Sequence, residues 1–295
     1  MDIRDLEVFL SVARHLNFTR AGEEVHLSQP SVSVRVRQLE EEFKVKLFEQ
    51  LGKKVALTEA GRLLEPHARR VLAALDDARH VIEEIRELER GVLRIGASTT
   101  PGIYLVPKLL AKFKSRHPKI ETHLEVADTR QVEEGLIRNE YDIGFVGGHL
   151  VGGEVKLMPW RTDEVVLVAS PDHLLAKRRQ VQLKEVARQQ FISRETGSAT
   201  QVAVNEKLQS LNLHLDAVME MNNPEAVKQC VQARLGVAFL SRMVIESELK
   251  AGTLVVVKVR GLTIRRELKI AFRKDKHLSR AAQAFIEVAN QASEK

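Results

Sequence analysis

The sequence has a single cysteine, Cys230, among its 295 residues, so no disulfide can form within one chain. A redox switch made of two cysteines of the same chain is thereby excluded, and such scarcity is typical of proteins in a reducing compartment. Cys230 falls in an apolar helical pattern, which favours a small core residue over a reactive thiol. No run of about 18 apolar residues occurs, so the sequence predicts no membrane-spanning helix.

The first residues lack the features of a secretory signal peptide. Asp2, Asp5 and Glu7 stand where such a signal is basic, and the apolar residues recur periodically instead of forming one run. We therefore expect a cytoplasmic protein. The net charge of +6 and the isoelectric point near 9.4 favour a polyanionic partner, although many basic proteins bind no nucleic acid.

Glycine and strand-forming runs are scarce before residue 90, and the character of the chain changes there. Up to that point the apolar spacing predicts helices, and beyond it β-rich runs alternate with amphipathic helices such as 106–116, 201–209 and 224–234. The alternation predicts an α/β region with a mostly parallel sheet. The runs that predict strands are 91–98, 120–127, 141–148, 164–170, 190–195, 216–221, 236–241, 253–259 and 268–272.

The first 43 residues have the spacing of a helix-turn-helix motif. A first helix is expected from 6 to 16, and Thr19 is the expected N-cap of a second helix, 20–25. Ser28 is the expected N-cap of a third helix, with Pro30 in its first turn, where a missing N–H costs nothing. Two short helices joined by a tight turn are typical of DNA-binding proteins in which the later helix enters the major groove.

The third helix is predicted to be polar and basic at its start and acidic at its end. Val32, Val36, Leu39 and Phe43 have the spacing of one buried stripe. Glutamates at 40–42 would repel phosphate, so that end should point away from a duplex. The other side presents residues at positions from which bases and phosphates can be reached, namely Gln29, Pro30, Ser33, Val34 and Arg37.

Residues 1–65 hold ten Lys and Arg against eleven Asp and Glu, so binding to DNA requires basic groups focused on one face. A small helical bundle that does not bind nucleic acid is the alternative. After the third helix, the runs 45–48 and 55–57 flank a turn of Gly52, Lys53 and Lys54. This pattern predicts a basic wing that contacts the DNA backbone. Thr58 is the expected cap of the next helix.

A helical pattern continues from residue 58 to about residue 89, which corresponds to roughly 45 Å. Pro66 should kink this helix near its start. Apolar residues recur at alternating spacings of four and three, as in a coiled coil, at Leu64, Ala68, Val71, Leu75, Ala78, Ile82 and Ile85. We expect this helix to pair two chains, and packing on its own domain is the alternative. A dimer would present two recognition helices to an interrupted palindrome.

Hydroxyl-bearing residues and glycines follow several predicted strands after residue 90. Hydroxyls between a strand end and a helix start favour an anion or carboxylate site, and glycine lets a ligand approach backbone N–H groups. The candidates are Ser98, Thr99, Thr100, Asp128, Thr129, Gly147, Gly148, Arg194, Ser198 and Thr200. No nucleophile–base pair accompanies them, which favours binding over catalysis. Helix capping is the alternative for any one hydroxyl, and His123, His149 and His173 lack metal-ligand spacing.

The segment FTRAGEEVHLSQPSVSVRVRQLEEEFKVKLFEQLGKKVALTEAG resembles the DNA-binding domain of LysR-type transcriptional regulators, through LSQPSVS, RQLEEE, LFE and LTEAG. The resemblance implies a winged helix-turn-helix at 1–58 and a linker and dimerisation helix at 59–89. The family usually has a basic residue in place of Val34 and an arginine in place of Gln50, which leaves the operator sequence open. The candidate DNA contacts are Thr19, Arg20, Ser28, Gln29, Pro30, Ser33, Val34, Arg35, Arg37, Lys53 and Lys54.

Residues 91–295 resemble the LysR effector domain, a two-lobed fold similar to type II periplasmic binding proteins, through DIGFVGG, LVASPDHLLA, SRETGSATQ and EAVKQCVQARLGVAFLSR. The resemblance implies one lobe at 91–162 and 267–295 and another at 163–266, with crossovers near 161–164 and 265–268. The effector would bind between the lobes and touch Ser98, Thr99, Thr129, Gly147 and Thr200. GASTTPGIYLVPKLL and SRETGSATQ are most similar to the regulators of carbon fixation and sulfur assimilation.

The predicted fold is therefore α/β and multidomain, with a winged helix-turn-helix, a linker helix and a two-lobed effector domain. We expect a homodimeric or homotetrameric transcription factor, not an enzyme, that binds double-stranded DNA and a small anionic effector, has RNA polymerase as a further partner and needs no metal or other cofactor. A cytoplasmic solute-binding protein or enzyme on the same scaffold is one alternative. A nucleoid-type architectural protein without an effector cleft is another.

Overall fold

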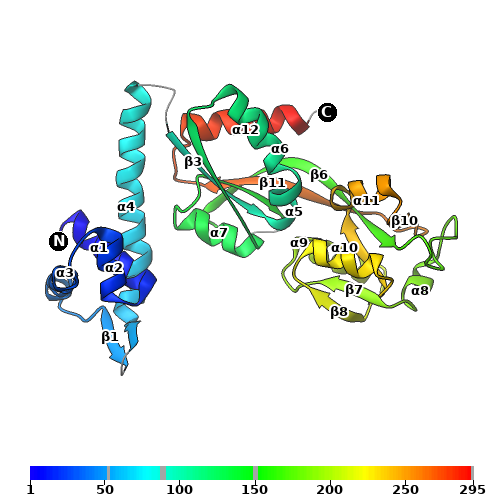
Figure 1. Ribbon diagram of the computed structural model, residues 1–295, viewed down its shortest axis with the longest axis horizontal. Helices are drawn as coiled ribbons and strands as arrows, with labels where there is room; N and C mark the ends of the chain where they lie inside the picture. Colours follow the sequence, from blue (N-terminus) through cyan, green and yellow to red (C-terminus); the bar gives the residue numbers. More distant parts are fainter. Residues whose placement is uncertain (52–53, 87–90, 149–151, 294–295) are drawn as a thin grey trace. The chain divides into compact units, whose positions relative to one another are not determined.

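The computed structural model describes residues 1–51, 54–86, 91–148 and 152–293 and contains two compact units, Met1–Glu87 and Leu88–Lys295. The first unit contains short helices, a β-hairpin and a long helix (Figure 1). None of the helices in the described part of the chain combines the length and the apolar character needed to cross a bilayer. The elements of the first unit are α1 (Ile3–His15), α2 (Phe18–Val25), α3 (Gln29–Phe43), β1 (Phe48–Leu51), β2 (Lys54–Leu57) and α4 (Glu59–Arg86).

The caps of the short helices set the tight turn of the motif. Ser28 caps α3 as predicted, because its hydroxyl accepts a hydrogen bond from the N–H of Ser31. The prediction that Thr19 caps α2 is wrong. Asn17 is the cap, and its side-chain oxygen accepts from the N–H groups of Thr19 (2.9 Å) and Arg20 (3.1 Å). Asparagine is the stronger N-cap residue, so the helix begins at Phe18 and includes Thr19.

The core of the first unit lies among α1, α3 and the start of α4. Phe9 of α1 and Val32, Val36 and Leu39 of α3 are almost completely buried. The predicted fourth member of the α3 stripe, Phe43, is instead 41% exposed. The chain turns at Lys44, whose φ is +55°, and Leu47 enters the core from the following segment.

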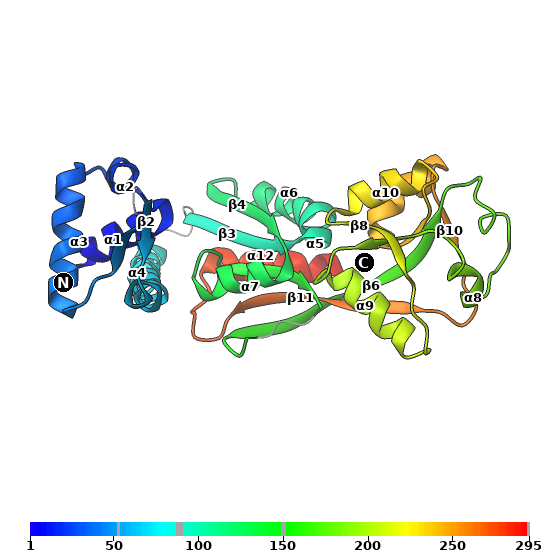
Figure 2. The same cartoon turned by 90° about the horizontal axis from the view of Figure 1, so that it is seen from below.

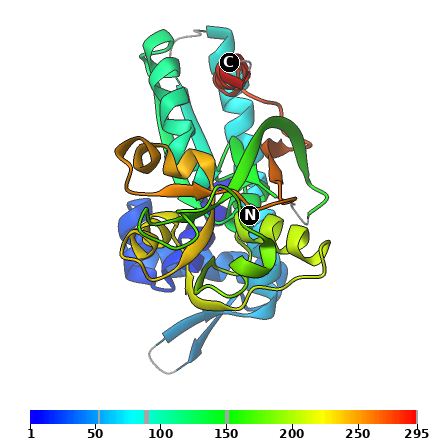
Figure 3. The ribbon, with the colours of Figure 1, turned by 90° about the vertical axis from the view of Figure 1, so that its right-hand side faces the viewer.

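Glu40 fastens the hairpin to α3 and does not act as a free surface charge. Its carboxylate accepts hydrogen bonds from the N–H groups of Leu47 (2.9 Å) and Phe48 (3.3 Å) and pairs with Lys46 (2.7 Å). The expectation that all of 40–42 project as repelling glutamates is therefore wrong at Glu40, which is 8% exposed. Figure 3 shows the hairpin β1–β2 projecting from the helices of this unit.

The first turns of α4 pack on the same unit. Thr58 caps the helix, because its hydroxyl accepts from the N–H of Gly61 (3.1 Å) and donates to the carbonyl of Lys46. A Cβ at Gly61 would lie 2.2 Å from the carbonyl oxygen of Leu47, so only glycine fits there.

The predicted seam of α4 divides between two environments. Leu64 and Ala68 pack in the core of their own unit, which agrees with the alternative that this helix packs on its own domain. Val71, by contrast, is 49% exposed. The side chains of Ile82 and Ile85 lie outside the described part of the structure. The helix continues through Pro66 to Arg86.

The second unit is built on one sheet of strand order β4-β3-β5-β11-β6-β9-β7-β8, with β10 paired to β6. The predicted mostly parallel sheet is corrected to a mixed one, because β6 and β11 run antiparallel to each other and to their neighbours. The strands are β3 (Gly91–Ser98), β4 (Ile120–Ala127), β5 (Ile143–Gly147), β6 (Val155–Ala169), β7 (Phe191–Arg194), β8 (Ala217–Met221), β9 (Val237–Ser241), β10 (Val255–Val257) and β11 (Ile264–Arg273).

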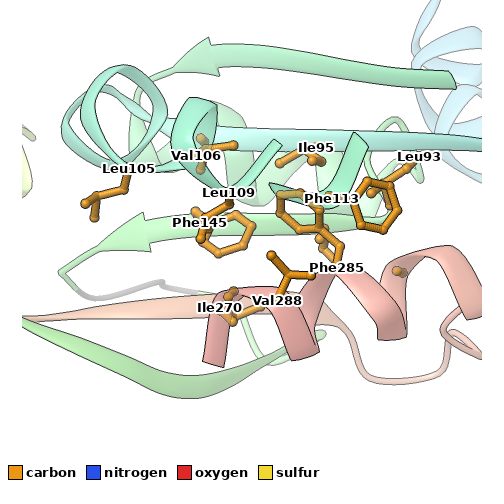
Figure 4. Packing of buried hydrophobic residues seen from close by; sticks show 14 of the residues in the cluster. Leu93, Ile95, Leu105, Val106, Leu109, Phe113, Phe145, Ile270, Phe285 and Val288 are labelled. Carbon is orange, nitrogen blue, oxygen red and sulfur yellow. The ribbon is translucent and has the colours of Figure 1, made fainter. Parts of the chain in front are cut away.

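Helices cover this sheet and divide it into two lobes with separate cores. In the first lobe, Phe113, Phe145 and Phe285 pack between the strands, α6 and α12 (Figure 4). In the second lobe, Phe191 and Phe239 pack with ring centroids 6.0 Å apart. The helices are α5 (Thr99–Tyr104), α6 (Val106–Arg116), α7 (Thr129–Ile137), α8 (Leu183–Val186), α9 (Ala199–Gln209), α10 (Pro224–Gln232), the 3₁₀ helix η1 (Arg242–Ile245), α11 (Glu246–Ala251) and α12 (Arg280–Ser293).

The long strands β6 and β11 pass through both lobes (Figure 2). β6 contributes Trp160 to the first core and Val165 to the second, and β11 contributes Leu268 to the first and Ile264 to the second. The two strands are hydrogen-bonded to each other along this crossing. Any change in the angle between the lobes must therefore bend this pair of strands.

Candidate functional site

The first candidate site is the exposed N-terminal end of α3. Gln29, Pro30 and Arg37 are exposed, and Val34 is 50% exposed. The side-chain amide of Gln29 donates to the hydroxyl of Ser33 (2.9 Å), which fixes a polar pair in the first turns. The fold thus brings these four residues and the half-buried Ser33 to one surface that can reach base edges.

Two further candidates lie at the start of α2, and two lie in the hairpin. Thr19 and Arg20 are exposed next to the capping Asn17. Lys53 lies outside the described residues. The backbone of Lys54 is described in β2, opposite Leu51, and its side chain is not. The described part of the first site is therefore formed by the starts of α2 and α3.

Arg35 is positioned differently from the other α3 candidates. Its guanidinium donates to the carboxylates of Asp5 (2.7 Å) and Asp2 (3.4 Å), which cap the start of α1. The side chain of Asp5 is 10% exposed, so this ion pair is partly shielded from water. Hydrogen bonding to Asp5 raises the pKa of Arg35, which stays charged. Arg35 therefore fastens α3 to α1.

The second candidate site is a pocket between the lobes of the second unit. Its volume is about 20 Å³, which is space for roughly one water molecule. It adjoins a larger cavity of about 610 Å³ that Gly147 and Gly148 help to line. The residues that line the small pocket are Ser98, Thr99, Thr100, Asp128, Thr129, Arg194, Glu195, Gly197, Ser198, Ala199, Thr200 and Arg266.

The pocket lies at the N-termini of α7 and α9, one from each lobe. Asp128 caps α7 by accepting from the N–H of Gln131 (2.8 Å), whereas Ser198 makes no side-chain cap at α9. Ser98 accepts from the N–H of Gly147, and Thr129 donates to its carbonyl, both at 3.3 Å. Because helix N-termini favour negative charge, this arrangement suits a small anion.

Two arginines line the pocket, and both carry a carboxylate partner. Arg194 makes a bidentate pair with Glu195, at 2.7 Å for each bond. Sequence reasoning missed Arg266, because it treated 265–268 only as a crossover between lobes. A signal was present: alternation along β11 places Arg266 on the same face as Ile264 and Leu268, and a buried arginine needs a partner.

A further contact between the lobes lies where α5 meets α10. The hydroxyl of Tyr104 donates to the carboxylate of Glu225, which also pairs with Lys228 (2.9 Å). Lys228 in turn pairs with Glu248 (2.7 Å). Burial and the bond to Glu225 raise the pKa of Tyr104, so the phenol remains a donor. This contact holds the lobes together.

No group of three or more His, Cys, Asp or Glu side chains within the described ranges is arranged to hold a metal ion. His123 pairs with Glu121 on the surface, and His149 lies outside the described residues. These histidines therefore give no support to a metal centre in the part of the chain that is described.

Comparison with known proteins identifies both units. Residues 3–62 match the family model "Bacterial regulatory helix-turn-helix protein, lysR family", and residues 86–294 match "LysR substrate binding domain". The chain is 39% identical over 287 residues to the RuBisCO operon transcriptional regulator of Allochromatium vinosum, covering 97% of this chain and 95% of that protein.

Two solved structures are also similar. The regulatory domain of Synechocystis PCC6803 CcmR in complex with 2-PG has a TM-score of 0.65 and 27% identity, and the match covers 70% of this chain and 99% of that one. Full-length CbnR complexed with its target DNA has a TM-score of 0.72 and 18% identity, covering 99% and 100%, which shows a shared fold. The two family models together match most of the sequence, and the chain therefore belongs to the LysR family of bacterial transcriptional regulators.

Proposed function

We propose that this LysR-type regulator controls carbon-fixation genes by binding their promoter DNA in response to a small anion between its lobes. The observation that carries the DNA-binding part is the exposure of Gln29 and Arg37 on α3, with the half-buried Ser33 bonded to Gln29. The 39% identity to a regulator of a RuBisCO operon supports the choice of target genes.

The start of α3 enters the major groove in this proposal. Glutamine can bind adenine through two hydrogen bonds, and arginine can bind guanine or a phosphate. The bond from Gln29 to Ser33 limits the rotamers of the glutamine before DNA binds. Two such units, joined in a homodimer or homotetramer with α4 in the interface, read the halves of an interrupted palindrome.

The effector acts by changing the closure of the lobes. The pocket of about 20 Å³ is too small for a whole metabolite, so a ligand that enters it extends into the adjoining cavity of about 610 Å³ or moves the lobes apart. A bound anion then shifts the balance between open and closed forms only by its differential affinity for them. The CcmR regulatory domain was solved with 2-PG, which makes 2-PG the first effector to test here.

The pocket acts by binding alone in this proposal, without a cofactor and without catalysis. The hydroxyls of Ser98 and Thr129 hydrogen-bond to the backbone of Gly147 and not to a histidine or carboxylate that could act as a base. The regulator works in the cytoplasm, where it meets promoter DNA and RNA polymerase.

A gel-shift series tests the proposal with the full-length protein and the DNA upstream of its own gene. We expect sequence-selective binding that weakens steeply with added salt, and a change in that binding when 2-PG is added. A solute-binding protein or enzyme would bind small anions but not this DNA, even at low salt. An architectural protein would bind any duplex equally, and its melting temperature would not respond to anions.

A further inference from the structure

Arg266 occupies the crossing of the two strands that join the lobes. It lies on β11 directly opposite Asp163 of β6, and its Nε donates to Asp163 Oδ2 at 2.7 Å. Arg266 is 8% exposed, and the side chain of Asp163 is fully buried. Ser241 donates to the other oxygen of Asp163 at 2.7 Å, so neighbouring strands hold the carboxylate on both sides.

The guanidinium of Arg266 has more donors than the protein uses. Nη2 is buried and has no hydrogen-bond partner among the described residues. A buried donor without an acceptor is unfavourable, whereas a ligand oxygen in the pocket would satisfy it. Nη1 lies next to Gly147 of the first lobe, where an added Cβ would approach it to 3.3 Å.

Arg194, the other arginine of the pocket, is used differently. Its Nε and Nη2 both donate to Glu195 at 2.7 Å, and Nη2 also approaches the carbonyl of Asn222 (3.4 Å). These bonds hold the segment before α9 in place. Of the two pocket arginines, Arg266 is the one with a buried donor left for a ligand.

We propose that Arg266 is the residue that selects anions in this pocket, by donating from Nη2 to a carboxylate or phosphate oxygen of the effector. This inference rests on the proposed anion-binding function and adds the residue that confers it. A charged acceptor makes the stronger hydrogen bond with a guanidinium, so Arg266 favours an anion over a neutral ligand of equal size. Because β11 runs through both lobes, a ligand bound to Arg266 contacts one of the two strands that must bend when the angle between the lobes changes.

The test measures ligand binding to full-length protein by titration calorimetry, with 2-PG, inorganic phosphate and neutral ethylene glycol as probes. The variants are Arg266→Gln, which removes the charge, and Arg266→Lys, which keeps the charge but loses the planar fork. Arg265→Gln is the matched control, because Arg265 is the exposed neighbour on the other face of β11.

We expect Arg266→Gln to weaken 2-PG binding about 10- to 100-fold, Arg266→Lys to weaken it less, and Arg265→Gln to change it less than about twofold. Equal 2-PG affinity in the wild type and in Arg266→Gln would overturn the inference and leave the proposed function standing. If the wild type binds neither anion, the anion-binding function itself fails, and the inference with it. Should Arg266→Gln not fold, Arg266→Lys decides: weaker binding supports the role, and unchanged binding refutes it.

Discussion

Two arginines two residues apart on α3 should respond to mutation in opposite ways. Arg37 is exposed and makes no ion pair with a described residue, so its guanidinium is available to DNA. Arg35 bonds to Asp5 at 2.7 Å, and the carboxylate of Asp5 is 10% exposed. The structure therefore predicts that Arg37→Ala affects DNA affinity and Arg35→Ala affects stability.

The magnitudes follow from these environments. Loss of one direct arginine contact should weaken DNA binding by about 1–3 kcal/mol, or lower the salt slope by about 1 if the contact is to a phosphate. Arg35→Ala leaves the shielded carboxylate of Asp5 without its guanidinium. Because Arg35 itself is 31% exposed, we expect the free energy of unfolding to fall by only about 1 kcal/mol.

The assay combines fluorescence anisotropy on a labelled operator duplex, over a series of salt concentrations, with urea unfolding of the same preparations. Gln38→Ala is the control, because Gln38 is an exposed neighbour on α3. Unchanged DNA affinity in Arg37→Ala, or full stability together with lost affinity in Arg35→Ala, would refute the division of roles between these two side chains.

Three further predictions concern close packing, the lobe contact and pH. Gly61→Ala should destabilise the first unit by about 1–3 kcal/mol in urea, whereas Gly91→Ala, with no atom within 4 Å of the new Cβ, should change stability by less than about 1 kcal/mol; equal effects would contradict this. Tyr104→Phe removes the bond to Glu225 between the lobes and should cost about 1 kcal/mol, and an unchanged urea midpoint would count against that contact. Hydrogen bonding from a serine, with nearby cations, lowers the pKa of Glu24, so its stabilising effect is present above its ordinary pKa of 4.5 and lost in more acid solution. The difference in stability between wild type and Glu24→Gln should therefore shrink on acidification, and a constant difference would contradict the assignment.

Local signals predicted elements well where they agreed with each other. β3 and β4 run over the predicted residues 91–98 and 120–127, and Ser28 caps α3 as expected. Alternation and capping chemistry act between neighbours in the sequence, so these features can be recognised without the fold. The prediction of β6 was incomplete, because it relied on local alternation alone and covered only 164–170 of a strand that begins at Val155. Pro159 and Trp160 interrupt its pattern, and the register shift against β11 accommodates them.

The candidate pocket could be predicted only in part. Strand-end hydroxyls such as Ser98 and Thr129 carry a local signature, and the structure brings them together between the lobes. Arg266 carries no such motif. Alternation along β11 gives only its face, because its partner Asp163 lies 103 residues away on β6, where Ser241 of β9 holds the other carboxylate oxygen. The same holds for Arg35, whose role depends on Asp5 at the start of another helix.

The sequence by itself determined the order of helices and strands, the helix-turn-helix spacing and the kinship with LysR regulators, because periodicity, caps and motifs are properties of short segments. Tertiary structure alone decided which charges are free to meet a ligand. Arg35 and Arg37 are the same residue type in similar sequence surroundings. Arg35 is nevertheless bound to the carboxylate of Asp5, whereas Arg37 faces water. Ion pairing and burial depend on contacts between distant segments, and these exist only once the chain has folded.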